Sequence, residues 1–545
     1  GARVPPRDMG FIYSTLAILL IFLFLPESCR ISYESPKPQN VMDSVHDSGQ
    51  PFKFCKVVDF ADWQDSEFEA TRSLLKIYGK NRKAWEFIQV YNGLHRLGVL
   101  NGRSRAIGLG VGHECLIYAF TNVCDHVIAT DLYNSENWST AAMSAEEVYQ
   151  RNPFPFQPDK LTVQHMDMTQ IEYPDASFDF VWSCCSIEHV SSFEDLHKVY
   201  AEIHRVLKPG GIAALTTEYN PTDRHSYEPH MLFTDRHWIH HWLTGENPLV
   251  QGFELLDEID DFITPIPENE PISRSDPRSS IQVLSKDIIL NSISFFMRKA
   301  GEFSQPYHDQ WLSPDWRTYL KGCNALNSDQ LDEAQALFQS LLENPDLDLR
   351  LKVATSRRLG TLLMQQGQTD EVVRICKQVF PYCQFAEDED HLVPLARVFR
   401  QVNLLDEAHA IYQHAETLPG ATINQVIRCI TYQAKYFAQK GNVQTALKLM
   451  EKAFQQTSGS KKVEDLHKVY FHLGLYHEKL GHISEAIAHY QQAIELSEPE
   501  TKFHNNCQLR LENCLNGKAK VERQEPKSDQ FFSKFKSFVK TLVKG

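Results

Sequence analysis

The sequence contains no CxxC pair, although 12 of its 545 residues are cysteine. Without such pairs, a paired-cysteine zinc or redox motif is excluded. The adjacent Cys184 and Cys185 are interpreted as small core residues at the end of a buried strand. Reduced thiols of this kind predict a cytoplasmic protein.

The sequence also has no excess of basic residues. Lys and Arg number 55 against 70 Asp and Glu, which gives a net charge of −15 at pH 7. Nucleic-acid binding depends on neutralising phosphates with Lys and Arg. We therefore expect no nucleic acid as the main substrate.

Long apolar runs are scarce, and the clearest one lies at residues 11–25. With its flanks this run is marginally long enough to cross a bilayer, which takes about 20 residues. It is interpreted as a signal anchor, a signal peptide or the product of an upstream start, with translation from Met42 as one alternative. Residues 1–51 are assigned to this apolar segment and a linker, and an anchor here would hold the protein on the cytosolic face of a membrane.

What the sequence does contain is a glycine at every second position of residues 106–114, where an apolar strand leads into a helical-looking stretch: Gly108, Gly110 and Gly112. Glycines allow the backbone to approach a nucleoside-bearing ligand closely. Asp131 ends the next strand, at the spacing at which a βαβ unit presents an acid to ribose hydroxyls. A dinucleotide fingerprint would need a third glycine where His113 or Cys115 stands, so NAD is disfavoured and S-adenosylmethionine (SAM) is favoured.

Three further segments follow in order: Met-Asp-Met at 166–168 after a third strand, a fourth strand at 178–183, and residues 206–211 leading into a fifth strand. Together with the glycine loop and Asp131, they make residues 80–299 resemble class I SAM-dependent methyltransferases, close to methyltransferase type 11. The resemblance implies a Rossmann-like, doubly wound α/β fold with a seven-stranded sheet over residues 52–301, including an N-terminal helical cap. It also implies that Asp131 holds the ribose, that Asp167 reaches the adenine amino group and that Met168 lies against the adenine ring.

Two positions depart from that family. An acid usually stands two residues before the first loop glycine, and the loop closes on a further glycine; here these positions are Gly108 and Glu114. Because the family's acid helps to hold the methionine amino group, we hypothesise that Glu114 or Glu86 substitutes for it. Residues 82–87 are interpreted chiefly as helix packing, with Arg82 or Lys83 at the SAM carboxylate as the alternative.

Residues 186–189 follow the fourth strand and are expected to face the methyl acceptor. His189 is the candidate catalytic base because imidazole titrates near neutrality, and His230 and Glu218 are weaker candidates. Cys185 stands where related metal-dependent enzymes carry an acid, so no metal is predicted. The insertion at 218–251 contains five histidines and is predicted to form a substrate lid over the carboxyl ends of the strands.

The second half of the chain repeats at intervals of 36 to 40 residues, with these aligned positions: Ala334, Val372, Ala408, Ala446 and Ala486. This pattern resembles tetratricopeptide (TPR) repeats and predicts an all-α solenoid over residues 302–516 that binds a protein partner. In the tail, 517–545, apolar residues share one helical face beside lysines. That helix is expected either to lie on an anionic membrane or to cap the last repeat.

These observations predict a SAM-dependent methyltransferase joined to a TPR solenoid. The expected acceptor is an oxygen of a small molecule or glycan, by analogy with type 11 relatives. The alternative is a catalytically inactive methyltransferase-like module in a membrane-associated TPR scaffold.

Overall fold

The structure is a computed structural model that describes residues 52–133, 144–274, 276, 281–285, 288–457, 463 and 465–519. The apolar segment at 11–25 and the basic amphipathic tail at 531–543 lie outside the described residues. Within those ranges, no helix combines the length and the apolarity needed to cross a bilayer.

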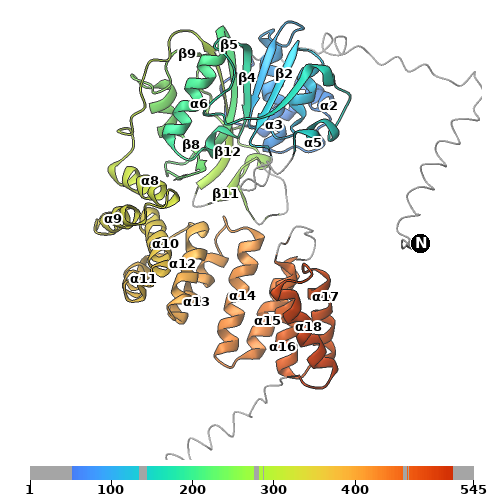
Figure 1. Cartoon of the computed structure of the whole chain (residues 1–545), viewed down its shortest axis with the longest axis vertical. Coiled ribbons are helices and arrows are strands. Elements are labelled where there is room, and N and C mark those ends of the chain that lie inside the picture. Colours follow the sequence, from blue (N-terminus) through green and yellow to red (C-terminus); the bar gives the residue numbers. More distant parts are fainter. Residues whose placement is uncertain are drawn as a thin grey trace, which may run out of the picture. The chain divides into compact units, whose positions relative to one another are not determined.

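The first half is built on a mostly parallel sheet (Figure 1). Its seven predicted strands are present: β1 (Arg105–Leu109), β2 (His126–Asp131), β3 (Leu161–His165), β4 (Phe178–Cys184), β5 (Leu207–Asn220), β9 (Phe253–Leu255) and β12 (Ile288–Lys299). They run in the order β3-β2-β1-β4-β5-β12-β9, and β12 is antiparallel to β5 and to β9. Short strands β8 (Thr234–Asp235), β10 (Ile272–Ser273) and β11 (Val283–Ser285) extend this sheet to ten strands.

Helices cover both faces of the sheet, because neighbouring residues of a strand point to opposite sides. On β12, Phe296 packs against Gly93 of α3 (Arg82–Arg96), so closely that a Cβ on this glycine would lie 2.3 Å from the ring. The next side chain along, Phe295, stacks on Trp238 of α7 (Arg236–Ile239) and shares a core with α6 (Phe193–Val206). The predicted doubly wound α/β fold is therefore confirmed.

The remaining elements of this half are short. They are the helices and turns η3 (Phe60–Gln64), α2 (Ser66–Leu74), α4 (Cys115–Thr121), α5 (Ala145–Gln150), η4 (Pro158–Lys160), η5 (Ile187–His189), η6 (His240–Thr244) and η7 (Pro267–Asn269), and the hairpin of β6 (Tyr227–Glu228) with β7 (Met231–Leu232).

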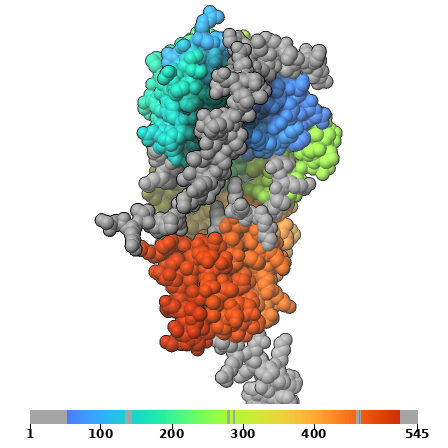
Figure 2. Space-filling view, turned by 90° about the vertical axis from the view of Figure 1, so that its right-hand side faces the viewer, coloured from blue at the N-terminus to red at the C-terminus, as the bar shows by residue number. Residues whose placement is uncertain are grey.

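The second half is a stack of antiparallel helix pairs (Figure 1). The helices are α8 (Pro314–Asn327), α9 (Leu331–Leu342), α10 (Leu349–Gln365), α11 (Thr369–Cys383), α12 (Glu389–Gln401), α13 (Leu405–Glu416), α14 (Ile423–Gln439), α15 (Val443–Thr457), α16 (Leu466–Leu480), α17 (Ile483–Glu495) and α18 (Lys502–Leu515). The space-filling view shows the orange-to-red helices as a closely packed block (Figure 2).

The repeat register predicted from the sequence is confirmed. The five aligned residues all lie in the second helix of a pair and are at most 2% exposed: Ala334, Val372, Ala408, Ala446 and Ala486. Glycines allow the paired helices to approach closely, as where a Cβ on Gly474 would lie 2.8 Å from the ring of Tyr490. The all-α solenoid is therefore built on small buried residues at matching positions.

The insertion predicted to be a lid also contacts the repeats. Glu228 of β6 accepts a hydrogen bond from the Tyr319 hydroxyl at 2.5 Å, forms an ion pair with Arg358 and lies 2.9 Å from His391 Nε2. Burial by itself would raise the pKa of Glu228, but Arg358 and His391 outweigh it and hold that pKa well below its ordinary value. The insertion is thus attached to helices α8, α10 and α12.

Candidate cofactor-binding and catalytic cleft

A cleft of about 1610 Å³ opens beyond the carboxyl ends of β1, β2 and β4. It brings together six of the site residues predicted from the sequence: Gly110, Gly112, Asp131, Asp167, Met168 and His189. Gly108 is the exception, since it lies inside β1 and does not line the cleft. Of the five insertion histidines, His230 alone lines it.

The loop after β1 depends on glycine at two positions. Gly110 has φ of +63° and Gly112 has φ of +49°, in the left-handed region that disfavours side chains. A Cβ on Gly110 would also lie 2.6 Å from Ser186 Cβ, and the Ser186 hydroxyl donates to the Gly110 carbonyl at 2.7 Å. The loop is therefore shaped as a bare backbone cradle facing the cleft.

Asp131 is held against this cradle. Its Oδ2 accepts from the Gly112 N–H at 2.8 Å, and its Oδ1 accepts from the Leu132 N–H at 2.7 Å. Burial raises the pKa of Asp131, while the two backbone hydrogen bonds oppose that rise. The carboxylate is thus positioned at the end of β2, where βαβ folds bind ribose hydroxyls.

Asp167 and Met168 come from the loop after β3. Asp167 Oδ1 accepts from the Thr169 N–H at 2.8 Å and from the Thr169 hydroxyl at 2.7 Å, which is a turn-forming contact. Both bonds use Oδ1, so Oδ2 is the oxygen that can face a ligand. Met168 Cε would lie 3.2 Å from a Cβ on Gly110, which places the thioether beside the glycine loop.

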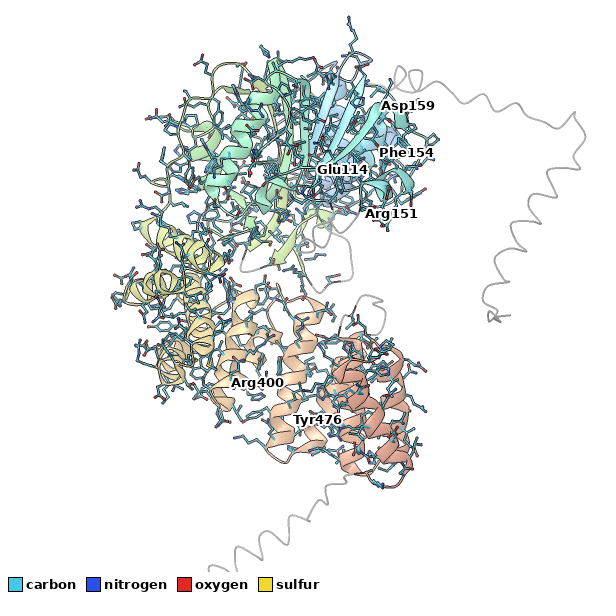
Figure 3. All side chains as sticks on the ribbon, in the orientation of Figure 1. Glu114, Arg151, Phe154, Asp159, Arg400 and Tyr476 are labelled. Atoms are coloured by element: carbon cyan, nitrogen blue, oxygen red, sulfur yellow. The ribbon has the colours of Figure 1, made fainter. Side chains whose placement is uncertain are left out.

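Gly108 and Glu114, the two departures, are linked through Trp182 of β4. A Cβ on Gly108 would lie 2.4 Å from Trp182 Cζ2, so the indole fills the space of any side chain there. The same indole donates its N–H to Glu114 Oε1 at 2.5 Å. Glu114 lines the cleft and is labelled in Figure 3. Glu114, at the start of α4, thus brings a carboxylate to the cleft, whereas β1 has none at Gly108.

Lys83 of α3 lies close enough to influence Glu114. Burial raises the pKa of Glu114 to about 8, and the positive charge of Lys83 acts against that rise. Lys83 lines the cleft beside Glu114, and its Nζ donates to the Cys184 carbonyl. Lys83 and Glu114 therefore both line the cleft, and Glu114 carries the opposite charge to Lys83 only when it is ionised.

Glu86, the other candidate acid, points into the protein. It is fully buried, and its carboxylate lies 3.1 Å from Lys83 Nζ and accepts from the Ser292 hydroxyl at 2.6 Å. Arg82, one turn before Glu86 in the same helix, pairs with Glu218 at 2.7 Å. Neither Glu86 nor Arg82 lines the cleft. Of the two candidate acids and the two candidate cations, Glu114 and Lys83 are therefore the ones that can contact a ligand.

His189 and His230 form a reciprocal pair at the cleft. His189 Nδ1 lies 2.9 Å from the His230 carbonyl oxygen, and His230 Nδ1 lies 3.1 Å from the His189 carbonyl oxygen. A carbonyl can only accept, so each Nδ1 carries the proton and the lone pair of the neutral ring is on Nε2. His230 has φ of +67°, which shows that the surrounding structure imposes this conformation.

Trp182 contributes to the site although the sequence gives no sign of it. A tryptophan inside a buried strand gives no local signal of a polar role, because its N–H partner comes from a distant loop. Among the described residues, no group of three or more His, Cys, Asp and Glu side chains could hold a metal ion.

Comparison with known proteins finds one family match in each half. Residues 106–215 match the family model of a methyltransferase domain, and residues 467–499 match that of a tetratricopeptide repeat. The chain joins a class I SAM-dependent methyltransferase domain to TPR repeats. The methyltransferase domain contains the whole glycine loop and Asp131, and the matched repeat covers α16 and α17.

The similar proteins align over short stretches. Sterol 24-C-methyltransferase of Eremothecium gossypii is 39% identical over 70 residues, which are 12% of this chain and 18% of the relative. The 27-O-demethylrifamycin SV methyltransferase of Amycolatopsis mediterranei is 40% identical over 57 residues, or 10% and 20%. The chain thus spans about a fifth of the length of these curated relatives. A solved S-adenosylmethionine-dependent methyltransferase from Mesorhizobium loti is 24% identical over 24% of this chain and 53% of that chain, with a TM-score of 0.18.

Proposed function

We propose that residues 52–301 transfer a methyl group from SAM to an oxygen of a small molecule or glycan, and that the repeats at 302–516 bind a protein partner. The observation that carries the proposal is the convergence of a glycine cradle, a ribose-type acid and a histidine in one cleft. These groups come from separate elements of the fold. A fold that had lost its ligand would have no physical need to keep them together.

The residues around the cleft fit SAM. The backbone at Gly110 and Gly112 admits the nucleoside, Asp131 would accept hydrogen bonds from the ribose hydroxyls, and Met168 would pack on the adenine. Asp167 would reach the adenine amino group through Oδ2. Charged hydrogen bonds contribute roughly 1.5 to 3 kcal/mol each, so each carboxylate is worth tenfold or more in affinity.

The methionine end of SAM carries an ammonium and a carboxylate. We assign the ammonium to Glu114 and the carboxylate to Lys83, because both side chains line the cleft, lie close enough to interact electrostatically, and have opposite charges once Glu114 is ionised. Glu114 would then bind the ammonium in place of the acid that the family has at the position of Gly108. Trp182 positions it by donating the indole N–H to its carboxylate.

His189 is proposed as the general base. SAM, when bound, supplies an electrophilic methyl group. The lone pair on His189 Nε2 would accept the proton of an acceptor hydroxyl, and the hydrogen bond from Nδ1 to the His230 carbonyl holds the ring in that tautomer. An acceptor with a hydroxyl group is favoured, because this is the type of nucleophile that needs a base.

The cleft has room for a sizeable acceptor. Pockets for drug-sized ligands typically enclose about 300 to 1,000 Å³, and this cleft measures about 1610 Å³. The names of the two curated relatives specify transfer to a carbon in one case and to an oxygen in the other. The choice of oxygen here therefore depends on His189 rather than on the relatives.

Isothermal titration of the full chain with S-adenosylhomocysteine tests the cofactor site. We expect micromolar binding, with Asp131→Ala weakening it by more than about tenfold. Asp159→Ala is the matched control, because Asp159 is exposed on η4 (Figure 3) and does not line the cleft. Binding that survives in Asp131→Ala would contradict the assigned site. A folded wild type that binds no S-adenosylhomocysteine would instead favour an inactive module in a TPR scaffold.

A further inference from the structure

The hairpin formed by β6 and β7 contacts both halves of the chain. Its pairing register leaves residues 229–230 as a two-residue turn directly after Glu228, the last residue of β6. Glu228 contacts the repeats, and His230 contacts the candidate base His189. The repeats and the cleft are thus joined by one short stretch of chain.

The Glu228 carboxylate is held by one side chain from each of three repeat helices, α8, α10 and α12. Its Oε1 accepts a hydrogen bond from the Tyr319 hydroxyl at 2.5 Å and lies 2.9 Å from His391 Nε2. Its Oε2 accepts from Arg358, whose Nε also donates to the Tyr319 hydroxyl at 3.0 Å. The Glu228 side chain is only 12% exposed, and hydrogen bonds to a charged group are strong. Both carboxylate oxygens are therefore fixed by the repeats.

His230 is tied to the segment that contains the candidate base by three hydrogen bonds. Its N–H donates to the Val190 carbonyl at 3.0 Å, and its Nδ1 donates to the His189 carbonyl at 3.1 Å. Its own carbonyl oxygen accepts from His189 Nδ1 at 2.9 Å. The position of that carbonyl therefore decides whether His189 carries its proton on Nδ1 and in which direction the ring points.

Little freedom remains between the backbone of Glu228 and the carbonyl of His230. Proline fixes its own φ and restricts the residue before it to extended conformations, so Pro229 stiffens this step. His230 has φ of +67°, which in a turn is usual for glycine or asparagine. A residue with a larger side chain keeps this conformation only while the surrounding structure holds it. A shift of Glu228 is therefore passed on to the His230 carbonyl, because the turn cannot absorb it.

We propose that Glu228 is a positioning residue for His189, acting through the carbonyl of His230, so that the repeats hold the base in its working tautomer. This inference rests on the proposed role of His189 as general base. It adds that helices α8, α10 and α12 belong to the unit that transfers the methyl group, whichever acceptor binds. Glu228 does not line the cleft, so its effect on the reaction is through His189.

NMR of the full chain labelled with nitrogen-15 histidine tests this role, because two-bond correlations within the ring report which nitrogen of a neutral histidine carries the proton. The His189 signals are identified by their loss in His189→Gln, and in the wild type we expect the Nδ1–H form. Glu228→Ala combined with Arg358→Met removes the contact without leaving either charge buried and unpaired. This double variant should lower the ratio of the Nδ1–H to the Nε2–H form by about fivefold. A wild type in the Nε2–H form would overturn the proposal.

Ser226→Ala is the matched control. It removes the hydrogen bond that the Ser226 hydroxyl accepts from Arg350 of α10 at 2.7 Å, so it weakens the same interface while the Glu228 contacts remain. Its tautomer ratio should equal that of the wild type. An equal fall in this control would overturn the proposal, since any lost contact between the insertion and the repeats would then suffice.

Each variant is also titrated with S-adenosylhomocysteine, which we expect to bind as it binds the wild type. An unchanged tautomer ratio in a double variant that binds it overturns the positioning role of Glu228 alone, whereas a wild type that binds none contradicts the proposed function instead. If the double variant does not fold, Tyr319→Phe decides, because it removes one hydrogen bond to Glu228 and keeps the ring. A tautomer ratio that does not fall by about twofold in this variant overturns the proposal.

Discussion

The raised pKa of Glu114 predicts how cofactor binding depends on pH. Burial raises the pKa of Glu114 to about 8 from the ordinary value of 4.5. Pairing with the methionine ammonium needs the ionised form, so binding below that pKa must first release a proton. At neutral pH, about one unit below the pKa, this release costs about 1.4 kcal/mol, or roughly tenfold in affinity.

The expected association constant for S-adenosylhomocysteine therefore rises by up to about tenfold per unit between roughly pH 6 and pH 8, and levels off above. Titration calorimetry in buffers of different ionisation enthalpy measures the proton release directly. Glu114→Gln keeps the hydrogen bond from Trp182 but cannot ionise, so its affinity should be lower and its slope flatter. The difference between the two profiles isolates the contribution of Glu114. A flat wild-type profile, or an equal slope in the variant, would refute the assignment.

The raised pKa of Glu114 also makes the stability of the chain depend on pH, in the direction opposite to cofactor binding. A folded-state pKa of about 8 against 4.5 unfolded means that the folded protein holds this proton more tightly. The contribution of Glu114 to stability is therefore present below the unfolded pKa and is lost as the pH rises through the folded pKa. Glu114→Gln should raise the Tm of the ligand-free chain more at about pH 9 than at about pH 5, while weakening cofactor binding. A lower Tm at both pH values would indicate that Glu114 is needed for packing instead.

Three other predictions concern separate parts of the molecule. Gly108→Ala places a Cβ 2.4 Å from the Trp182 ring and should lower the free energy of unfolding by about 1 to 3 kcal/mol, with partial recovery in the double variant with Trp182→Phe; urea titration would show additive losses if the contact were irrelevant. Glu228→Gln leaves the Arg358 charge without its buried partner, and a loss of about 3 to 5 kcal/mol is expected in the same assay, whereas an unchanged midpoint would argue against this contact. His189→Ala should lower the rate of methyl transfer by about 10² to 10⁴ with unchanged S-adenosylhomocysteine binding, and a normal rate would exclude it as the base.

The features that sequence reasoning predicted are local ones. The glycine spacing and the acid at the end of the second strand belong to one βαβ unit, which places them at one edge of the sheet, and the strand motifs follow one another in chain order. The repeat register was predictable for a similar reason, because small residues recur where paired helices touch. Asp131 lies beside the glycine loop as expected, because Asp131 and Gly112 belong to the same βαβ unit.

Some expectations were incomplete because they depend on distant contacts. Gly108 was grouped with the cofactor residues, but its place in β1 under the Trp182 ring follows from a strand more than seventy residues away. The choice between Glu114 and Glu86 was open in the sequence; α3 packs on β12 and buries Glu86, which leaves Glu114 as the one of the two that lines the cleft. The insertion was predicted to be a lid, and in the structure its residues Ser226 and Glu228 also form hydrogen bonds with side chains of the repeats.

By itself, then, the sequence determined the class of fold, the nature of the cofactor loop and the phase of the repeats, since these follow from backbone conformation and from periodicity along the chain. Tertiary structure alone decided which acid faces the cleft and how His189 and His230 hold each other through their backbone carbonyls. Such contacts join residues far apart in the chain, and their energies depend on burial and on the charges brought alongside, which periodicity does not encode.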